Sequence, residues 1–306
     1  MKTLTTLVGV LALATLSHAQ NNVSWVASTG NDSNTCVRTS PCRTFQVAYS
    51  KTNPGGVIHA VDAADYGELT ISKSLTLDGG NSGAVITGIL GTALTLSSAA
   101  EAVNIRNLTI HQLGGPLSGI LMLLAGSGTV NIENVAITTV VNTRGISIQS
   151  NGSDSGAATQ VNLRNVSING FGTGVSTLIG QLTADRLSTN VTANGVWLTG
   201  NWVNATFRDS VFHTPGGNGV LASSDINSQI TRSAMFERCE FALSTQGLTT
   251  FQSPQGSPIV VKISNSVFAN NVSAIGQDGG TVISYRNNAF SGNIFDGNPP
   301  LTTSFK

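Results

Sequence analysis

The chain has 306 residues, of which 40% are hydrophobic, only 10% are charged and 34 are glycine. Its 15 basic and 15 acidic side chains cancel, so no long-range field favours nucleic acid or anionic lipid as a partner, and the apolar content argues against disorder. Length alone leaves open one large domain or two smaller ones.

The first residues have the pattern of a secretory signal peptide. Lys2 gives a positive start, residues 4–16 are mainly apolar, and Ser17-His18-Ala19 forms a small-residue cleavage site. The apolar stretch is shorter than the about 20 residues that a membrane span needs, and no later segment is long enough. We therefore predict that residues 1–19 are removed and that the protein is extracellular or periplasmic, with no membrane span.

Residues 20–56 are predicted to form an N-terminal cap. Cys36 and Cys42 lie six positions apart in a loop rich in Gly, Asn, Ser and Pro, and we expect them to form a disulfide in an exported protein. Residues 41–49 predict a short helix with Thr44 as its N-cap, and Gly55-Gly56 ends the segment before strands start at residue 57. The third cysteine, Cys239, lies between strand-like residues, which predicts a buried and inert thiol.

An early loop gathers three carboxylates within seven residues, at Asp62, Asp65 and Glu68. Oxygen ligands of this kind suit Ca²⁺. The favoured interpretation is a solvated turn, with a calcium site as the alternative.

Residues 57–292 contain an internal repeat, in which VNIRNLTI at 103–110 recurs as VNIENVAI at 130–137 and as VNLRNVSI at 161–168. Each unit has an alternating strand, a turn residue that is usually Asn, a second short strand, a variable loop and then Gly followed by an aliphatic residue. The turn residue recurs every 21 to 31 residues, at Gly79, Asn107, Asn134, Asn165, Arg186, Asp209, Arg238, Asn265 and Asn287. Units this short cannot bury a face alone, whereas units stacked at the ~4.8 Å strand spacing can. The pattern predicts an all-β, right-handed parallel β-helix, because a β-propeller repeat is longer, at about 40 residues.

Alternation along each strand predicts the direction of the side chains. Alternate apolar residues of the repeat point inward. The Asn positions mark a bend, where Asn tolerates unusual backbone angles and can bond to the Asn of the next coil as a buried ladder. The residue before each bend points outward and alternates in charge as far as Glu237, which predicts ion pairs between coils. These positions are Asp78, Arg106, Glu133, Arg164, Asp185, Arg208, Glu237, Ser264 and Arg286.

The opening WVASTGNDSNTCVRTSPCRTFQVAYSK, followed by GGVIHAV and LTISKSLTLDGG, resembles secreted bacterial right-handed β-helix proteins of the pectin-lyase-like superfamily. More narrowly, it is similar to a group of small exported members. The G-N-D and S-P-C-R-T-F elements are the most specific part. The resemblance implies the fold strongly and the function weakly, since lyases, hydrolases, tailspikes and adhesins share this scaffold.

Polysaccharide enzymes of this superfamily place their chemistry on the exposed face of the strand that here begins at the Gly-aliphatic pair. Glycoside hydrolysis needs two carboxylates, and β-elimination needs a base and usually a cation. The outward positions expected on this face are Leu121, Ser147, Ser176, Trp197, Leu221 and Thr249. None is charged, so we predict a non-catalytic protein without a cofactor.

A shallow sugar-binding groove is predicted where polar and aromatic residues fall together. Aromatic rings can stack on a sugar while polar groups bond its hydroxyls. The residues that could form it are Asn169, Asn190, His213, Trp197, Trp202 and Ser176. Buried tryptophans and exposed polar residues that bind nothing are the alternative.

The function predicted from the sequence is a secreted β-helix module that contacts extracellular polysaccharide or a second copy of itself. The outward Leu121 and Leu123 favour self-association into a homo-oligomer. The alternatives are a polysaccharide lyase or glycoside hydrolase with a displaced site, and an oligomeric adhesin or tailspike-like structural protein. Residues 293–306 are predicted to form a C-terminal tail, in which Pro299-Pro300 stops the ladder.

Overall fold

The computed structural model describes residues 20–97, 102–115, 118–124, 128–140, 143–150, 159–224, 231–297 and 301–303. The predicted signal peptide and Pro299-Pro300 lie outside the described residues. No helix in the described ranges has the length and apolar character needed to cross a membrane.

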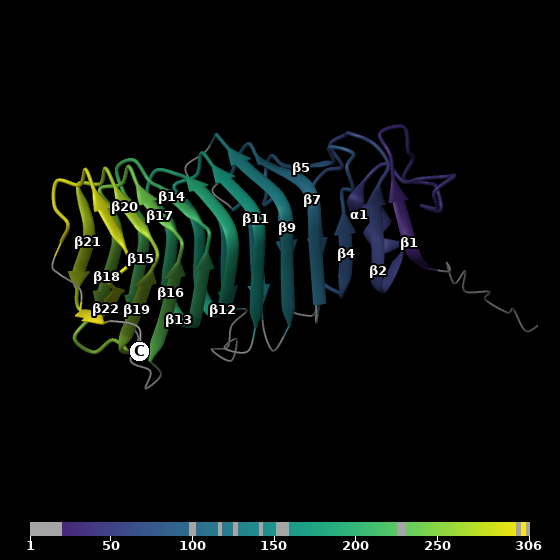
Figure 1. The fold of residues 1–306 in the computed structure, drawn as a ribbon. Coiled ribbons are helices and arrows are strands. Elements are labelled where there is room, and N and C mark those ends of the chain that lie inside the picture. Colours follow the sequence, from purple (N-terminus) through teal and green to yellow (C-terminus); the bar gives the residue numbers. More distant parts are fainter. Residues whose placement is uncertain are drawn as a thin grey trace, which may run out of the picture.

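The chain forms a β-solenoid of about 9 turns with one short helix, as predicted. All pairings between its strands are parallel, and each coil follows the previous one from the N-terminal to the C-terminal end (Figure 1). The solenoid has three sheet faces. We call them the Gly face, the Asn face and the third face.

The Gly face begins at the Gly-aliphatic pairs. It contains β3 (Leu69–Ile71), β6 (Leu94–Leu96), β8 (Ile120–Leu124), β10 (Arg144–Ser150), the first parts of β12 (Thr173–Asn190) and β13 (Asn194–Arg208), β15 (Asn218–Ser224), β18 (Gln246–Gln252) and β21 (Ser273–Asp278).

The Asn face precedes the bend. It contains β1 (Asn21–Val26), β2 (Thr52–Ala60), β4 (Leu75–Asp78), the first parts of β7 (Ala102–Gln112), β9 (Thr129–Thr139) and β11 (Gln160–Asn169), the later parts of β12 and β13, β16 (Arg232–Glu237), β19 (Ile259–Ser264), β22 (Thr281–Tyr285) and β24 (Leu301–Thr303).

The third face follows the bend. It contains β5 (Val85–Gly88), the ends of β7, β9, β11 and β12, and then β14 (Val211–His213), β17 (Glu240–Ala242), β20 (Val267–Ala269) and β23 (Ala289–Ser291). The parallel strand pairing extends into both predicted terminal segments. Strand β1 lies within residues 20–56, and β24 lies within residues 293–306.

Seven of the nine residues in the predicted bend column adopt the left-handed conformation, whereas Gly79 and Asn287 do not. The seven, with φ between 48° and 59°, are Asn107, Asn134, Asn165, Arg186, Asp209, Arg238 and Asn265. The Nδ2 of Asn134 donates to Asn107 Oδ1 at 3.1 Å, and that of Asn165 to Asn134 Oδ1 at 2.8 Å, so the Asn ladder is confirmed. Our expectation that it is buried was wrong, because Asn134 and Asn165 are exposed at the corner of the solenoid.

A bidentate ion pair replaces the amide contacts later in the bend column. The Nε of Arg238 donates to Asp209 Oδ1 at 2.7 Å, and its NH2 group donates to Oδ2 at 3.0 Å. The guanidinium of Arg238 lowers the pKa of the Asp209 carboxyl. Neighbouring bends are therefore joined by amides where Asn repeats, and the Asp209 and Arg238 bends are joined by opposite charges.

The interior changes character along the solenoid. Early coils bury aliphatic columns, such as Ile105, Ile132 and Leu163. Later coils stack phenylalanines, with ring centroids 4.8 Å apart for Phe207 and Phe236 and 4.5 Å apart for Phe241 and Phe268. Such burial is the main stabilising term, because each coil covers the apolar surface of the next.

Stacked glycines explain the Gly-aliphatic motif. A Cβ atom at Gly174 would lie 2.5 Å from the carbonyl oxygen of Gly195, and one at Gly195 would lie 2.4 Å from that of Gly219. These distances are too short for any side chain. The motif therefore marks the place where neighbouring backbones approach most closely.

The charge column before the bend has the predicted register. Asp78 pairs with Arg106, Arg106 with Glu133, and Glu133 with Arg164 across successive strands. Ion pairs form between Arg106 and Asp78 at 2.9 Å and between Arg164 and Glu133. Glu237 continues the series with Arg208 at 3.4 Å.

The cap is organised by the residues of the G-N-D and S-P-C-R-T-F elements. Helix α1 (Phe45–Ser50) begins after Thr44, whose side chain accepts a hydrogen bond from the Val47 amide, so the predicted N-cap is confirmed. The predicted helix start at residue 41 was wrong by four positions. The Oδ1 of Asp32 accepts the backbone amides of Arg43 at 2.8 Å and Thr44 at 2.9 Å, which leaves that segment outside the helix.

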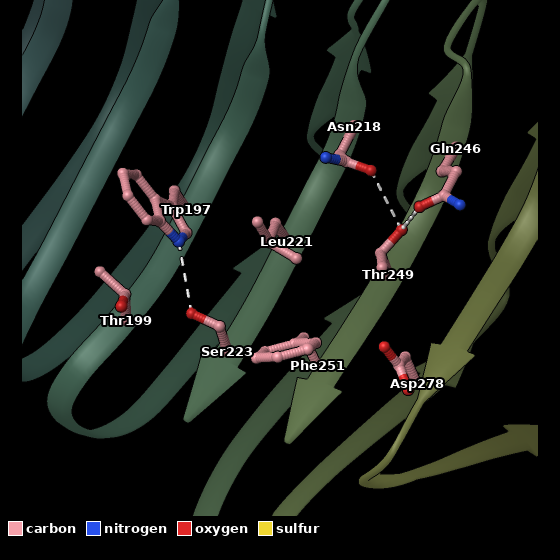
Figure 2. A pocket seen from close by; sticks show the side chains of 9 residues that line it. All are labelled: Trp197, Thr199, Asn218, Leu221, Ser223, Gln246, Thr249, Phe251 and Asp278. Atoms are coloured by element: carbon pink, nitrogen blue, oxygen red, sulfur yellow. Dashed lines mark hydrogen bonds between the residues drawn. The ribbon is translucent and has the colours of Figure 1, made fainter. Parts of the chain in front are cut away.

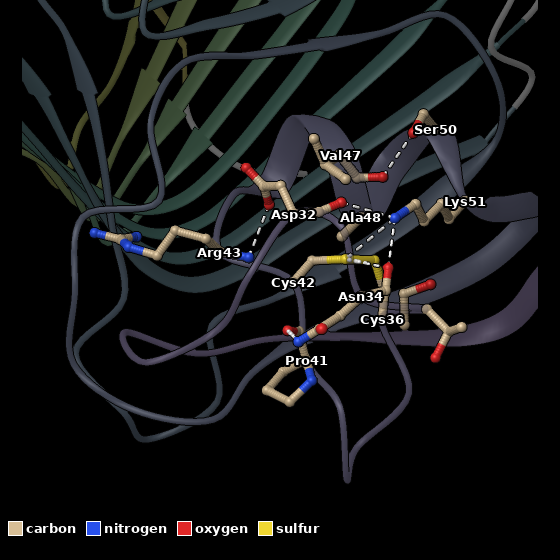
Figure 3. The surroundings of a disulfide bond; sticks show 12 residues. Asp32, Asn34, Cys36, Pro41, Cys42, Arg43, Val47, Ala48, Ser50 and Lys51 are labelled. Atoms are coloured by element: carbon tan, nitrogen blue, oxygen red, sulfur yellow. Dashed lines mark hydrogen bonds between the residues drawn. A yellow bond between two sulfur atoms is a disulfide. The ribbon is translucent and has the colours of Figure 1, made fainter.

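The predicted disulfide between Cys36 and Cys42 is present, with Cα atoms 4.7 Å apart (Figure 3). The ammonium of Lys51 donates to the carbonyl oxygens of Asp32 at 2.9 Å and of Asn34, which fixes the loop to the end of the helix. Strand β2 begins at Thr52 rather than at residue 57. The predicted Gly55-Gly56 stop lies inside this strand, next to a register shift between β1 and β2.

Cys239 is 2% exposed, as expected for a buried thiol. Its Sγ contacts the carbonyl oxygens of Phe207 and Glu237. Burial raises the pKa of the thiol to about 12, so the reactive thiolate is scarce at neutral pH.

Candidate functional site

The early acidic loop does not assemble a metal site. The carboxylate of Asp62 accepts hydrogen bonds from the Ser28 backbone amide at 2.8 Å, from the Ser28 hydroxyl and from the Tyr66 hydroxyl at 2.6 Å. Asp65 accepts the Gly67 amide at 3.0 Å. No group of three His, Cys, Asp or Glu side chains within the described ranges is placed to hold a metal ion.

The third carboxylate of that loop is turned to a neighbouring coil. Glu68 Oε1 accepts the backbone amides of Ile89 at 3.1 Å and Gly91 at 3.3 Å. The alternative of a calcium site at Asp62, Asp65 and Glu68 is therefore not supported by their positions. Each carboxylate instead ties a loop to its neighbour.

Hydrogen bonds favour an ionised Asp62 and a neutral Tyr66 where these two side chains meet. Donation from the side chain of Ser28, and then from Tyr66, lowers the pKa of Asp62 below its ordinary value. Burial, and then the hydrogen bond to Asp62, raises the pKa of Tyr66. These shifts stabilise a carboxylate facing a neutral phenol, an arrangement that holds the cap against the first coil.

The predicted polar column of the sugar groove exists on the third face. Asn169 pairs with Asn190 and Asn190 with His213 on successive strands. His213 Nε2 lies 3.4 Å from Glu240 Oε1, a residue that was not in the predicted groove. The column belongs to β11, β12 and β14, whereas Trp197 lies in the part of β13 that belongs to the Gly face.

Two members of the predicted groove are buried. Trp202 is 1% exposed and its Nε1 donates to the backbone oxygen of Ser223 at 3.3 Å, so its ring cannot stack on a sugar. Ser176 is also fully buried, and its hydroxyl has no hydrogen-bond partner among the described residues. Including these two residues in an open groove was wrong.

A hollow of about 490 Å³ lies on the Gly face around Trp197, and we call it the Trp197 hollow (Figure 2). Its described lining residues are Trp197, Thr199, Asn218, Leu221, Ser223, Gln246, Thr249, Phe251 and Asp278. They come from β13, β15, β18 and β21, so the hollow runs along the solenoid axis over about 14 Å, at ~4.8 Å for each step between strands.

The register explains why these side chains meet. Trp197 is paired with Leu221, and Leu221 with Thr249, so they lie side by side on neighbouring strands (Figure 2). Two residues further along the strands, Ser223 is paired with Phe251, and Phe251 with Asp278. Two adjacent outward columns therefore form the hollow.

Hydrogen bonds position the polar part of the lining. Trp197 Nε1 donates to Ser223 Oγ at 3.3 Å, which orients the indole ring. Thr249 Oγ1 lies 3.1 Å from Asn218 Oδ1 and also contacts the side-chain oxygen of Gln246. The result is an aromatic and aliphatic surface bordered by amides and hydroxyls.

Trp197 also lies close to a cation. The Arg144 guanidinium carbon is 5.9 Å from the centroid of the Trp197 ring, within the range of a weak cation–π contact. Arg144 lies on β10, two strands before β13, and is not among the described residues that line the hollow.

The expected outward column of the Gly face is confirmed. Its uncharged residues Leu121, Ser147, Ser176, Trp197, Leu221 and Thr249 occupy successive strands in register. The prediction missed Asp278, in the next outward column. The Gly-aliphatic pattern is altered in that coil to Ala274-Ile275, and accepting Ala for Gly would have placed Asp278 on this face.

Two further hollows have a different character. One of about 390 Å³ lies on the Asn face, and its described lining includes Asn104, Asn131 and Asn162 together with Glu133, Arg164 and Asp185 of the charge column. The other, of about 760 Å³, lies at the cap beside Gln20 and Lys51, and no aromatic residue is among its described lining. The outward Leu121 and Leu123 are half-buried on β8, and self-association through them remains a prediction.

No protein-family model and no curated protein matches the chain. The solved structure of pectate lyase Pel9A is similar, with a TM-score of 0.63 over 92% of this chain and 80% of that protein, at 14% identity. The chain has the right-handed parallel β-helix fold of the pectin-lyase-like type.

Two further solved structures share this β-helix. The A-module of the mannuronan C-5 epimerase AlgE6 from Azotobacter vinelandii has a TM-score of 0.55 over 82% of this chain and 81% of the module, at 14% identity. A GH136 lacto-N-biosidase from Eubacterium ramulus has a TM-score of 0.52 over 93% of this chain and 67% of that enzyme, at 10% identity. At identities this low, the structural similarity establishes the fold and leaves the activity open.

Proposed function

We propose that this protein binds carbohydrate in the Trp197 hollow, outside the cytoplasm. The observation that carries the proposal is the combination of Trp197 and Phe251 with the side chains of Asn218, Gln246 and Thr249 in one open hollow. A sugar ring presents an apolar face and a rim of hydroxyls. Aromatic rings and amides match these two surfaces.

Binding without cleavage is favoured by the titratable groups. Glycoside hydrolysis uses two carboxylates about 5 to 10 Å apart. Asp278 is the only carboxylate among the described residues that line the hollow. The disulfide in the cap supports an oxidising compartment, since such bonds persist outside the cytosol.

A carbohydrate-active enzyme is the second candidate. It is favoured by the similar structures, which are a pectate lyase, a mannuronan epimerase and a lacto-N-biosidase. It is also favoured by the position of Asp278 on the Gly face, where the resemblance to pectin-lyase-like proteins leads us to expect such chemistry. In that case Asp278 would act as the base or the acid.

The test is a polysaccharide array that reads both retention of the protein and release of reducing or unsaturated ends, with and without calcium. We expect retention without release. The variant Trp197→Ala should bind at least about tenfold more weakly, because it removes the largest stacking surface. Phe295→Ala is the control, since Phe295 is an exposed aromatic residue outside the hollow.

Release of sugar ends that is lost in Asp278→Asn would establish the enzyme instead. Equal binding by the Trp197 and Phe295 variants would place any carbohydrate site elsewhere on the protein. Unchanged melting temperatures of both variants are required for either conclusion.

A further inference from the structure

We infer that the Trp197 hollow selects uncharged sugar chains and disfavours polyuronates, an inference that rests on the proposed carbohydrate binding. The similar structures include a pectate lyase and a mannuronan epimerase, so this selectivity would separate the present protein from them. The argument depends on the charges that a bound chain would meet.

The described lining of the hollow carries a negative charge. Asp278 is exposed, and no other described residue of the lining carries a charge. The Asp278 backbone is paired with Phe251, but its side chain makes no hydrogen bond and no ion pair within the described ranges. Its carboxylate therefore faces any ligand without a compensating cation, and a uronate group placed near it is repelled.

Two cations near the hollow, Arg144 and Arg232, are not among its described lining residues. Arg144 lies at the ring of Trp197, two strands toward the N-terminal end. Arg232 is 1% exposed; its NH1 group donates to the Trp202 backbone oxygen at 2.7 Å and its Nε to Ser224 Oγ at 3.1 Å. A buried guanidinium held by these contacts cannot form a direct ion pair with a sugar carboxylate in the hollow.

The rest of the lining suits a neutral chain. A uronate that enters loses hydration on the apolar surface of Trp197, Leu221 and Phe251, and without a paired cation that loss is not offset. Hydroxyl groups lose less hydration and can bond to the amides of Asn218 and Gln246. Trp197 and Phe251 lie two strands apart, about 10 Å, and offer two stacking positions along one chain.

The experiment compares neutral gluco-, manno- and galacto-oligosaccharides with oligogalacturonates and oligomannuronates of equal length, by calorimetry at low and high salt. We expect at least one neutral series to bind and the uronates to bind roughly tenfold more weakly or not at all, with no recovery on adding calcium. In Asp278→Asn the ratio of uronate to neutral affinity should rise by about threefold at low salt, and less at high salt.

Asp185→Asn is the matched control, because it removes the same charge from the Asn face, and neither affinity should change. Uronate binding equal to or tighter than neutral binding, with or without calcium, would overturn the inference while leaving carbohydrate binding intact. No binding of any series would instead overturn the proposed function. A melting temperature of Asp278→Asn equal to that of the parent protein confirms that its affinities report on charge.

Discussion

The Asn face and the Gly face come from the same stacked coils, but their outward side chains differ in how they interact with those of the neighbouring coils. On the Asn face of the early coils, outward asparagines meet asparagines and charged residues meet opposite charges one coil away. Asn131 Nδ2 donates to Asn104 Oδ1 and Asn162 Nδ2 to Asn131 Oδ1, both at 2.9 Å, and the charge column beside them alternates in sign. Hydrogen-bonding groups there are used within the protein.

On the Gly face the outward column changes its chemistry at every coil from Ser176 to Thr249. Ser176 is followed by Trp197, then Leu221, then Thr249. Neighbours that differ in size and polarity cannot form a continuous ladder, so they leave a hollow and free surface for a ligand. A strictly repeating column thus stabilises the solenoid, whereas a varied column can recognise another molecule.

The largest expected effect comes from the glycines that start the Gly face. Gly195→Ala would place a Cβ atom 2.4 Å from the Gly219 oxygen and 2.7 Å from Thr189 Oγ1, so coils must separate. We expect a loss of about 2 to 3 kcal/mol in the free energy of unfolding, measured by urea denaturation. Gly276→Ala is the control, because its Cβ would approach only the flexible Gln246 side chain, at 3.2 Å. Equal stability of the two variants would contradict close backbone stacking.

The next effect concerns Asp78, which accepts hydrogen bonds from Arg106, at the start of the charge column, and from Asn107, the first Asn of the bend column. Burial acts to raise the pKa of Asp78, but hydrogen bonds from Asn107, the Gly80 amide and Arg106 outweigh it, so the pKa is lowered. The folded state therefore holds the proton more weakly than the unfolded chain. The resulting stabilisation is present above the unfolded-state pKa of about 3.9 and is lost as the pH falls through the lower folded-state value.

Asp78→Asn should thus lower stability by about 1 to 2 kcal/mol at neutral pH, and the difference should shrink below about pH 4. Unfolding curves over a pH series measure it. The control is Asp185→Asn. The Asp185 side chain has no hydrogen bond or ion pair among the described residues, so the free energy of unfolding of this variant should differ little from that of the parent protein at any pH. A constant deficit of Asp78→Asn across the series would show that shape, not charge, matters at this position.

The smallest effect tests the alternating charges. Arg164→Glu removes the ion pair with Glu133 and places like charges next to Glu133 and Asp185. Because the pair is partly exposed, we expect a loss of about 0.5 to 1 kcal/mol at low salt that decreases at high salt. Lys262→Glu makes the same change in net charge beside Met235 and Ile283, which are uncharged. The melting temperatures of both variants in a salt series decide whether the alternation matters.

Local patterns were sufficient to predict the scaffold. The Asn bend column, the charge column, the Thr44 cap, the Cys36–Cys42 pair and the burial of Cys239 all depend on spacing along the chain. Prediction from these sequence patterns failed where the strand pairing is irregular. The pairing of β12 with β13 shifts register twice before Gln181, so sequence spacing could not show that Trp202 turns into the interior.

The amino-acid sequence by itself determined a stack of parallel coils. Its strands alternate every two residues, with Asn and Gly at fixed places, and the backbone hydrogen-bonding groups of such a coil find partners only on a neighbouring coil. The tertiary structure decided which outward residues are covered and which are open. Ser176, Trp197 and Asp278 all lie on the outward side of the Gly face, yet Ser176 is buried, whereas Trp197 and Asp278 line the hollow and Asp278 is also exposed to solvent. Their surroundings come from coils 20 to 30 residues away, and packing across coils, rather than period along a strand, sets the site.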